Sequence, residues 1–598
     1  MRTPVLPMVL SLAAVAGACV AEAPTKPGED LQAFLADDWT YWMSAAPEAA
    51  TAFGVPGHDA RWTDYSPDAI AQRATHLRQT LAHLVSLTRD AERFSDVDRL
   101  NFDLFKGMIQ AAVDGLAFDN DPFPIPGVIP HNLAMPINQM EGIQQDIPRV
   151  ISLMPAATAA DYEHIIARLQ SAPALIDQTI ALMRKGLEKG RTPPRITMRD
   201  VPGQVAGQIV ADPMASPLLA AFGRFPAGVS AGDRQRLTTA AAAAYSSAVR
   251  PAFERLHEFL VKTYVPACRD SIAASALPDG AAMYAYNVRW HTTTAATPQE
   301  IHTLGLAEVK RIRAEMDAII AKIGFKGGFD AFKTHLRTNP AFFYRDADAL
   351  EHAYAVIAKR ADPQLAHLFG ALPRTPYGIA RIPAAVAPSQ TTAYYEPGAL
   401  VAGRPGNMFV NTFKLDARPK WEMEALTLHE AVPGHHLQIA LAQELDGMPE
   451  FRRNLSYTAF VEGWALYAES LGEDMGFYQD PYSKFGQLTY EMWRAVRLVV
   501  DTGLHSMGWT RDQAIEFFQA NAAKTLQDIT VEVDRYIVWP GQALGYKIGQ
   551  LRIREMRTRA ERDMGARFDV RKFHDVVLGQ GAVPMDVLEA RVRNWSTR

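Results

Sequence analysis

The sequence predicts a mainly α-helical fold, large enough for two lobes, with one small β-sheet. Apolar residues recur every three or four positions over most of the chain, for example over 158–190 and 231–266, as they do on the buried face of a helix. One stretch, NMFVNTFKL at residues 407–415, alternates like a strand. The 598 residues are 48% hydrophobic and 21% charged, which is an ordinary composition for a globular protein with a large core.

The N-terminus has the pattern of an export signal. Arg2 precedes an apolar run from Val5 to Ala18, which is too short to span a bilayer as a permanent helix. Ala16-Gly17-Ala18 supplies the small residues of a cleavage site, so residues 1–18 are predicted to be a signal peptide. We therefore expect an exported protein on the periplasmic side of a bacterial membrane.

Cys19 follows the predicted cleavage site directly and suggests a lipid anchor. The sequence around it resembles a bacterial lipobox, although Ala16 stands where Leu is usual, which weakens the case for lipidation but not for export. Residues 19–30, rich in proline and charge, are predicted to be a flexible tether. If Cys19 carries lipid, Cys268 has no cysteine partner within the chain.

The remaining chain is predicted to form an N-terminal helical lobe at 31–290 and a second, catalytic helical lobe at 291–598. The segment 118–148 is too rich in proline for continuous helix and is predicted to be a long loop on the surface or along a cleft. The second lobe opens with a clear helix, because Thr297 and Glu300 have the spacing of a capping box.

Net charge and hydropathy restrict the partners. The net charge is −5 and no basic tract occurs, which argues against nucleic acid. No segment after the N-terminus has an apolar run of membrane length, so a membrane contact is expected only through Cys19. The oligomeric state cannot be inferred from these features.

The strongest chemical signal lies in residues 421–470. Four potential metal-site residues occur within eight positions: His429, Glu430, His435 and His436. A following helical pattern carries Glu462 and Glu469. Two histidines and a carboxylate can take three positions around a catalytic zinc ion and leave the fourth to water, and a carboxylate next to the first histidine can remove a proton from that water.

The spacing differs from the ordinary H-E-x-x-H motif. The position four residues after His429 is Pro433, which must kink, bulge or break the helix, and Gly434 adds backbone freedom there. Such a break could bring His435 to the place of the usual second ligand. His436 is the alternative, because seven residues are two helical turns and return to the same face.

HEAVPGHHLQ at 429–438, followed by VEGWALYAE at 461–469, resembles the bacterial family of predicted lipoproteins labelled domain of unknown function 885. The resemblance runs from about Leu31 to the C-terminus, and that family is similar to zinc metallopeptidases such as thimet oligopeptidase. It implies a metallopeptidase-like helical fold and favours His435 over His436, since the family's second motif histidine is often another residue. It also implies that Glu462 is the third zinc ligand and that Glu469 supports a ligand.

The same resemblance implies two further parts of a peptidase site. A sheet edge beside the metal helix would pair with the backbone of an extended substrate, and the predicted strand lies just before that helix. Tyr394, Tyr395 and Asn411 are substrate candidates there, with structural roles as the alternative.

A segment rich in glycine and tyrosine after residue 530 would supply a phenol to the oxyanion of the scissile carbonyl, through Tyr536 or Tyr546. Arg535 could bind a substrate carboxylate or form an ordinary ion pair. His505 is a further candidate, although a lone histidine on an apolar helix is more often a core residue.

These observations predict a Zn²⁺-dependent metallohydrolase that cleaves short peptides, with Glu430 as the general base. Two alternatives remain: a zinc hydrolase of a non-peptide amide or ester, and a non-catalytic periplasmic binding lipoprotein. Glu430 argues against the second, because a structural zinc is closed by four protein ligands and needs no base beside it.

Overall fold

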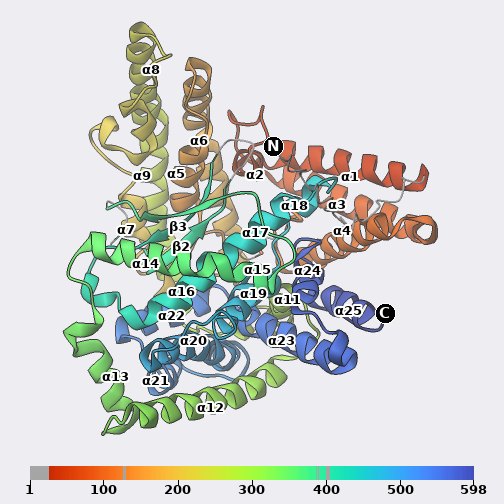
Figure 1. Cartoon of the computed structure of the whole chain (residues 1–598). Helices are drawn as coiled ribbons and strands as arrows, with labels where there is room; N and C mark the ends of the chain where they lie inside the picture. The colour runs from red at the N-terminus through yellow and green to blue at the C-terminus, as the bar shows by residue number, and fades with distance from the viewer. Residues whose placement is uncertain (1–25, 126–129, 385–386, 388–389, 399–403) are drawn as a thin grey trace, which may run out of the picture.

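The computed structural model describes residues 26–125, 130–384, 387, 390–398 and 404–598, and it is mainly helical with one three-stranded sheet (Figure 1). The predicted signal peptide and Cys19 lie outside the described residues. The tether prediction was wrong for residues 26–30, which already belong to α1 (Lys26–Ala45). This helix is anchored because Leu31 and Leu35, one turn apart, are buried in the core.

The first half of the chain is helical, as predicted. Ser66, Ser95 and Thr158 cap three of its helices by accepting a backbone N–H three residues on. After α1 come α2 (Pro47–Phe53), α3 (Pro67–Ser86), α4 (Asp96–Gly115), α5 (Ile143–Leu153), α6 (Ala159–Glu188), α7 (Val201–Ala206), α8 (Ala231–Ala244), α9 (Arg250–Phe259), α10 (Val265–Ala267) and α11 (Gly280–Thr292).

The second half begins with α12 (Pro298–Ile323), where the predicted capping box of Thr297 and Glu300 is present. The helices that follow are α13 (Gly328–Thr338), α14 (Ala347–Ala361), α15 (Leu365–Leu368), α16 (Met423–Glu430), α17 (His435–Gln443), α18 (Glu450–Arg453), α19 (Thr458–Ser470), α20 (Pro481–Ser506), α21 (Arg511–Asn521), α22 (Leu526–Val538), α23 (Leu544–Met564), α24 (Val570–Leu578) and α25 (Met585–Ser596).

The hydrophobic cores divide the chain differently from the predicted boundary at residue 290. One core joins α1–α4 to α14, α16, α19, α24 and α25, a second lies among α5–α9, and a third among α12, α13 and α20–α22. The first N-terminal helices therefore pack on the same core as the metal motif, whereas α6, α8 and α9 project together from the body (Figure 1). Local periodicity does not show this pairing, because it depends on contacts between distant segments.

The sheet has the order β1-β3-β2, formed by β1 (Tyr377–Arg381), β2 (Ala393–Glu396) and β3 (Gly406–Val410). β3 pairs in parallel with β1 and antiparallel with β2. The predicted strand is thus present over 406–410, but it is the central strand, so the edge strand beside the metal helix is β2. Asn411 follows β3 and donates to the carbonyls of Ala387 and Thr391, which gives it a role in holding this loop.

The predicted loop at 118–148 ends earlier than expected, because α5 begins at Ile143. Its described part, 119–125 and 130–142, contains no helix, and its strand pairing is limited to an isolated bridge. It lines a cavity of about 290 Å³ together with residues of α3, α5, α6 and α11. The loop therefore lies along a hollow, one of the two predicted positions.

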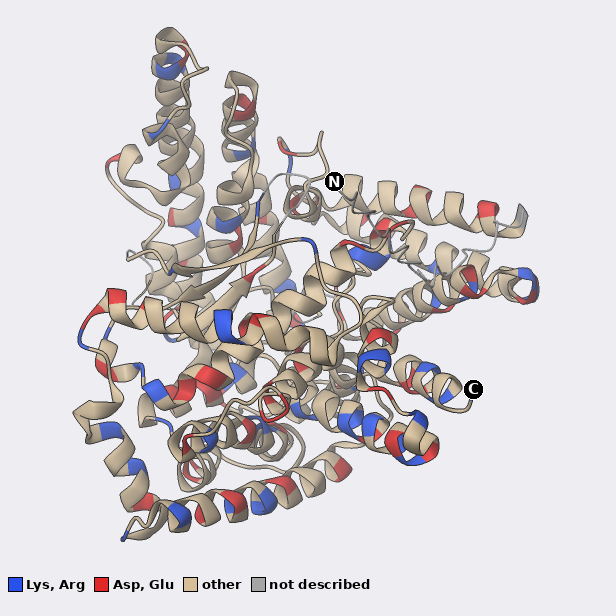
Figure 2. Cartoon of the chain, in the orientation of Figure 1, with Lys and Arg blue, Asp and Glu red and all other residues tan. Residues whose placement is uncertain are grey.

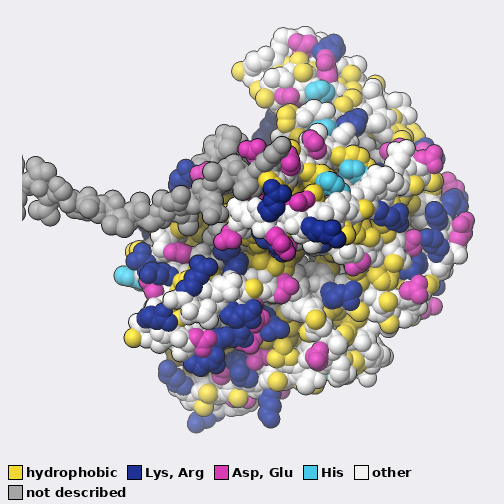
Figure 3. All heavy atoms as spheres, turned by 90° about the vertical axis from the view of Figure 1, so that its right-hand side faces the viewer, with side chains coloured by type: hydrophobic (Ala, Val, Ile, Leu, Met, Phe, Trp, Pro, Cys, Tyr) yellow, Lys and Arg dark blue, Asp and Glu magenta, His cyan; other side chains and the backbone are white. Residues whose placement is uncertain are grey.

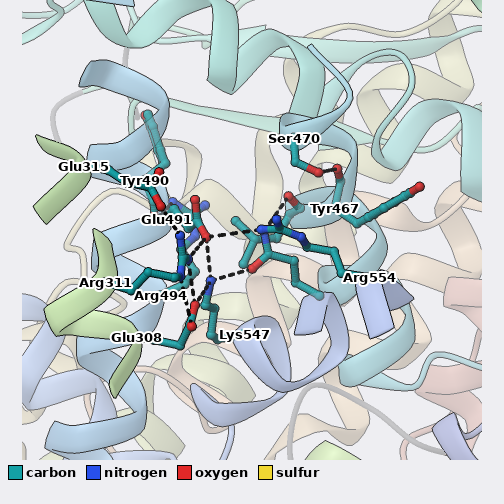
Figure 4. Close-up of polar contacts among 12 residues, drawn as sticks. Glu308, Arg311, Glu315, Tyr467, Ser470, Tyr490, Glu491, Arg494, Lys547 and Arg554 are labelled. Atoms are coloured by element: carbon teal, nitrogen blue, oxygen red, sulfur yellow. Dashed lines mark hydrogen bonds and ion pairs between the residues drawn. The ribbon is translucent and has the colours of Figure 1, made fainter. Parts of the chain in front are cut away.

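A buried network of charges joins the three helices α12, α20 and α23 (Figure 4). Lys547 of α23 is fully buried, with Nζ 2.8 Å from Glu491 of α20 and 3.0 Å from Glu308 of α12. Arg311 of α12 also contacts Glu491, at 2.6 Å. Burial alone would raise the pKa of Glu491, but the charges of Lys547 and Arg311 outweigh it and hold that pKa well below its usual range.

Surface charges of both signs are interspersed along the outer helices (Figure 2) and over the face shown in Figure 3. Among the described residues, no helix is long and apolar enough to cross a membrane.

Asp501 should make stability depend on pH. This fully buried carboxyl accepts from Tyr284 at 2.6 Å and from the Gly541 N–H at 3.1 Å, and burial raises its pKa to about 7. The folded protein therefore holds a proton that the unfolded chain releases near pH 4, so this contribution is present at low pH and lost as pH rises to about 7. Asp501→Asn should abolish this decrease in the free energy of unfolding, which amounts to a few kcal/mol at about 1.4 kcal/mol per pKa unit.

The measurement is the free energy of unfolding of both proteins at pH 5 and pH 8. From pH 5 to pH 8, the free energy of unfolding of the variant should rise relative to that of the wild type. An unchanged difference would contradict the assignment.

Candidate metal centre

The helix carrying His429 breaks immediately after Glu430. α16 ends there, α17 begins at His435, and the backbone of Ala431 leaves the helical region with φ −95° and ψ −114°. The predicted break at Pro433 is thus confirmed. The N–H of His436 donates to Ala431 O at 3.1 Å, which restarts the helix after the break.

Gly434 makes this break compact. A Cβ at this position would lie 1.9 Å from the carbonyl oxygen of His429 and 2.5 Å from that of Leu428, so any larger residue must displace backbone. The break is also fixed from outside, because Trp464 of α19 donates its indole N–H to Pro433 O at 2.9 Å.

Replacing Gly434 with alanine should destabilise the fold by about 1–3 kcal/mol through overpacking and should weaken metal binding, because the clash falls on the backbone of His429. Thermal unfolding and bound-metal content test this. Gly107→Ala is the matched control, since a Cβ at Gly107 of α4 meets no atom within 4 Å. Equal stability and metal content in both variants would contradict the role of Gly434.

His429, His435 and Glu462 come together at the break. Their ligand atoms lie within 4.8 Å of one another, and they form the metal-compatible group found among the described residues. Nε2 of His429 is 3.6 Å from Glu462 Oε2, and Nε2 of His435 is 3.5 Å from the same oxygen. A tetrahedral zinc ion, with bonds of about 2.0–2.2 Å to nitrogen and oxygen, separates its ligand atoms by about 3.4 Å. The residues therefore fit zinc.

The position of Glu462 is set by close packing of α19 on α23. The adjacent Gly463 meets Gly549 of α23 so closely that a Cβ on Gly463 would lie 2.5 Å from the Gly549 Cα. Burial would raise the pKa of Glu462, but hydrogen bonds and charges from His429 and His435 outweigh it and lower that pKa well below its usual range. The carboxylate is thus held in the ionised form that a metal ligand needs.

Glu469 supports His429 from the side opposite Glu462. Its Oε1 lies 2.8 Å from His429 Nδ1, and the side chain is fully buried. An imidazole N–H bonded to a carboxylate fixes the tautomer that presents Nε2 to a metal. Burial would lower the pKa of His429, but the contacts with Glu462 and Glu469 raise it to about 9.

Glu430 adjoins this group without belonging to it. Its Oε2 accepts the backbone N–H of Tyr395, from the unpaired side of β2, at 3.0 Å. Burial raises the pKa of this carboxyl. A carboxyl of raised pKa beside a metal group can both accept and return a proton.

His436 points away from the metal group. Its Nδ1 lies 2.9 Å from the hydroxyl of Tyr395, and its ring packs against Tyr377 at 4.6 Å between centroids. Burial lowers its pKa to about 4. Of the two alternatives left open by the sequence, the geometry therefore favours His435 as a ligand and gives His436 a place between helix and sheet.

The two candidate tyrosines differ in accessibility. Tyr536 is fully buried, and its hydroxyl lies 3.1 Å from Arg497 Nε and 3.3 Å from Trp493 Nε1. Tyr546 is 8% exposed, and its hydroxyl accepts from Arg535 at 3.2 Å. Tyr394 stacks on Phe409 of β3, a contact within the sheet.

Arg535 and His505 make internal contacts. Arg535 binds Glu532 at 3.3 Å and Gln542 at 2.7 Å, which is the ordinary ion pair rather than a free two-pronged edge. His505 accepts the Ala274 N–H at 3.0 Å and lies 2.8 Å from Tyr536 O. Burial lowers its pKa to about 4, as expected for a neutral core histidine.

Sequence reasoning missed Arg494. This α20 residue is buried, and its Nη2 lies 3.9 Å from Glu469 Oε1, the carboxylate that supports His429. The available signal was an arginine inside the apolar helix pattern YEMWRAVRLVV, since a buried charge requires a partner or a function.

Fold and site together define a mainly helical protein with a His-His-Glu group suited to zinc. The chain belongs to the family described as bacterial protein of unknown function, DUF885, which matches residues 47–592. This confirms the resemblance to that family, whereas the likeness to zinc metallopeptidases stays a prediction. A comparison with curated proteins finds no match.

Two solved structures share the fold. A protein from Colwellia psychrerythraea described as a predicted lipoprotein is 28% identical, with a TM-score of 0.86 over 96% of this chain and 100% of its own. One from Shewanella oneidensis, described as a predicted lipoprotein of unknown function, is 16% identical, with a TM-score of 0.72 over 94% of this chain and 99% of its own.

Proposed function

We propose that the protein is a zinc-dependent metallohydrolase of the metallopeptidase type that cleaves short peptides. One observation carries this proposal: Glu430 stands directly after a candidate ligand, outside the His429–His435–Glu462 group. Three protein ligands leave a coordination position open, whereas a structural zinc site uses four. A carboxylate beside an open coordination position can take a proton from a bound water, which is a catalytic role and not a structural one.

His429, His435 and Glu462 would hold the zinc ion. When bound, zinc lowers the pKa of water to about 7 and polarises a carbonyl group. Glu430 takes the water's proton and passes it to the leaving amine. The Tyr395 N–H orients the Glu430 carboxylate through Oε2, and Oε1 remains for the proton.

Tyr546 is the better of the two candidates for donating to the oxyanion of the scissile carbonyl. Its neighbour Gly545 packs so closely against Thr458 that a Cβ there would lie 2.7 Å from Thr458 Cγ2. Thr458 is the first residue of α19, one turn before Glu462. The backbone beside Tyr546 therefore lies against α19, the helix that carries Glu462, whereas the hydroxyl of Tyr536 is enclosed in the core.

The size of the substrate is suggested by the cavity beside the 118–148 loop. Trp290 lines it, and the next residue, His291, lies 3.3 Å from the hydroxyl of Thr458. Helix α11 thus contributes to the cavity through Trp290 and contacts α19 through His291, although no residue of the metal group lines the cavity. A hollow of about 290 Å³ accommodates a few residues rather than a folded protein.

The cellular site we propose is the periplasmic side of a bacterial membrane, with a lipid anchor on Cys19. The description of both structural neighbours as predicted lipoproteins supports this, as do the apolar run and the small residues before Cys19.

Metal removal tests the proposal. Purified protein should contain about one zinc per chain, lose hydrolysis of a short-peptide library on treatment with a chelator, and regain it when zinc is restored. Cleavage that survives complete zinc removal would contradict the metal's role. Zinc binding without cleavage of any peptide, but with cleavage of simple esters or other amides, would replace the peptide substrate with the non-peptide alternative.

A further inference from the structure

We propose that Arg494 binds the free C-terminal carboxylate of the substrate, so that the site releases one or two residues from the C-terminal end of a peptide. This inference rests on the proposed function and specifies its substrate class. It follows from the burial of Arg494, its incomplete hydrogen bonding and its contact with Glu469, the carboxylate that supports His429.

The charge of Arg494 is only partly compensated by neighbouring groups of the protein. Its side chain is 8% exposed, its Nε is buried without a hydrogen-bond partner, and Nη1 makes only a long bond of 3.4 Å to Tyr490 O. Nη2 is 3.9 Å from Glu469, beyond hydrogen-bond distance. The ion pair with Glu469 therefore compensates the desolvation of this guanidinium only in part, and N–H groups are left without a hydrogen bond.

The neighbouring arginine provides a comparison. Arg497 lies one turn further along α20, and its Nη2 binds Glu532 at 3.0 Å while its Nε binds the Tyr536 hydroxyl at 3.1 Å. Arg494 has no carboxylate at such a distance among the described residues. Arg497 and Arg535 each also have one buried nitrogen without a hydrogen bond, but both bind Glu532, at 3.0 and 3.3 Å, so the comparison favours Arg494 as the arginine for a ligand carboxylate.

Aromatic rings hold Arg494 in place. Its guanidinium carbon lies 4.7 Å from the Tyr490 ring centroid and 5.5 Å from that of Trp493. Tyr490, Glu491 and Arg494 all come from α20, so the charge network shown in Figure 4 also fixes this helix. A guanidinium held by rings, with N–H groups to spare, is suited to two-pronged binding of a carboxylate.

The position beside the metal group sets the length of the released fragment. Arg494 is linked to His429 through Glu469 by contacts of 3.9 and 2.8 Å. With the imidazole ring and a zinc bond of about 2.1 Å added, the path is at most about 11 Å, and the contact between Arg494 and a carboxylate takes about 3 Å of it. One residue of extended peptide spans about 3.3–3.6 Å, so one or two residues fit between that carboxylate and a scissile bond near the metal group.

The test compares matched tetrapeptides that end in a free carboxylate or in an amide. Binding is measured by calorimetry on zinc-loaded protein made inactive by Glu430→Gln, and cleavage products are identified on protein with Glu430 intact. The acid should bind about 10–100-fold more tightly than the amide, since a charge-assisted pair contributes about 1.5–3 kcal/mol. The products should be a free amino acid or a dipeptide from the C-terminal end.

Arg494→Gln should remove most of this acid-over-amide preference without changing affinity for the amide. Arg494→Lys keeps the charge but loses the planar fork, so it should retain part of the preference and serves if the Gln variant fails to fold. Arg554→Gln is the control, because Arg554 is 47% exposed and its ion pair, at 3.8 Å, is with Glu491 and not with Glu469. Zinc content and thermal unfolding are measured for all variants.

Two outcomes separate the inference from the proposed function. If peptides are cleaved but acid and amide bind equally, or if the preference survives in Arg494→Gln, the inference is overturned and the peptidase proposal stands. If the zinc-loaded protein neither binds nor cleaves any peptide, the proposed function fails and this inference fails with it.

Discussion

Replacing Glu430 with glutamine should lower peptide hydrolysis by about two to four orders of magnitude, the usual contribution of a general base. Glutamine keeps the size of the side chain and can still accept the Tyr395 N–H, which lies 3.0 Å from Oε2 in the native protein. It cannot take a proton from water. Because Glu430 lies outside the ligand group, zinc content should remain at the wild-type level.

The measurements are kcat on a cleaved peptide and zinc per chain. Glu450→Gln, an exposed carboxylate at the start of α18, controls for loss of one negative charge and should behave as wild type. Near-normal turnover in the Glu430 variant would refute its role as the base. Loss of zinc in the same variant would instead mean that Glu430 is a ligand.

Changing His435 to phenylalanine should give protein largely free of zinc and without activity. Phenylalanine keeps much of the ring volume but removes both nitrogens, including the Nε2 that lies 3.5 Å from Glu462. His436→Phe is the matched comparison one residue away. Its imidazole contacts Tyr395 and Tyr377, so it should retain stoichiometric zinc with reduced activity at most.

Zinc per chain after dialysis against a defined zinc buffer, together with kcat, distinguishes the two variants. An outer partner of a ligand changes affinity by about 10–100-fold, whereas a three-ligand site depends on every ligand. The reverse order, with zinc lost only in His436→Phe, would refute the assignment. Equal loss in both would indicate damage to the helix break.

The ligand types could be predicted from the sequence because the chemistry is local: His429 and Glu430 are adjacent, and Glu462 follows on the next strongly apolar helix. The choice between His435 and His436 could not be derived from the residues alone, since it depends on how the backbone turns at Pro433 and Gly434. Only the family resemblance favoured one of them beforehand.

Helices with strong end signals were the most predictable part of the fold, and the capping box at Thr297 is the clearest example. The pairing of distant segments was not predictable. The packing of α1–α4 on the core of the metal motif depends on contacts across hundreds of residues, and the partners of Arg494 lie on two different helices. A periodic pattern shows which face is buried, not what covers it.

The burial of Lys547 bears on how this region can open. Its ammonium group pairs with a carboxylate from each of two other helices, since Glu308 comes from α12 and Glu491 from α20. Undocking any of the three would separate at least one of these buried ion pairs, which is costly. Partial opening of α12, α20 and α23 is therefore disfavoured, and amide protons of these helices should exchange mainly through cooperative global unfolding rather than local fluctuation.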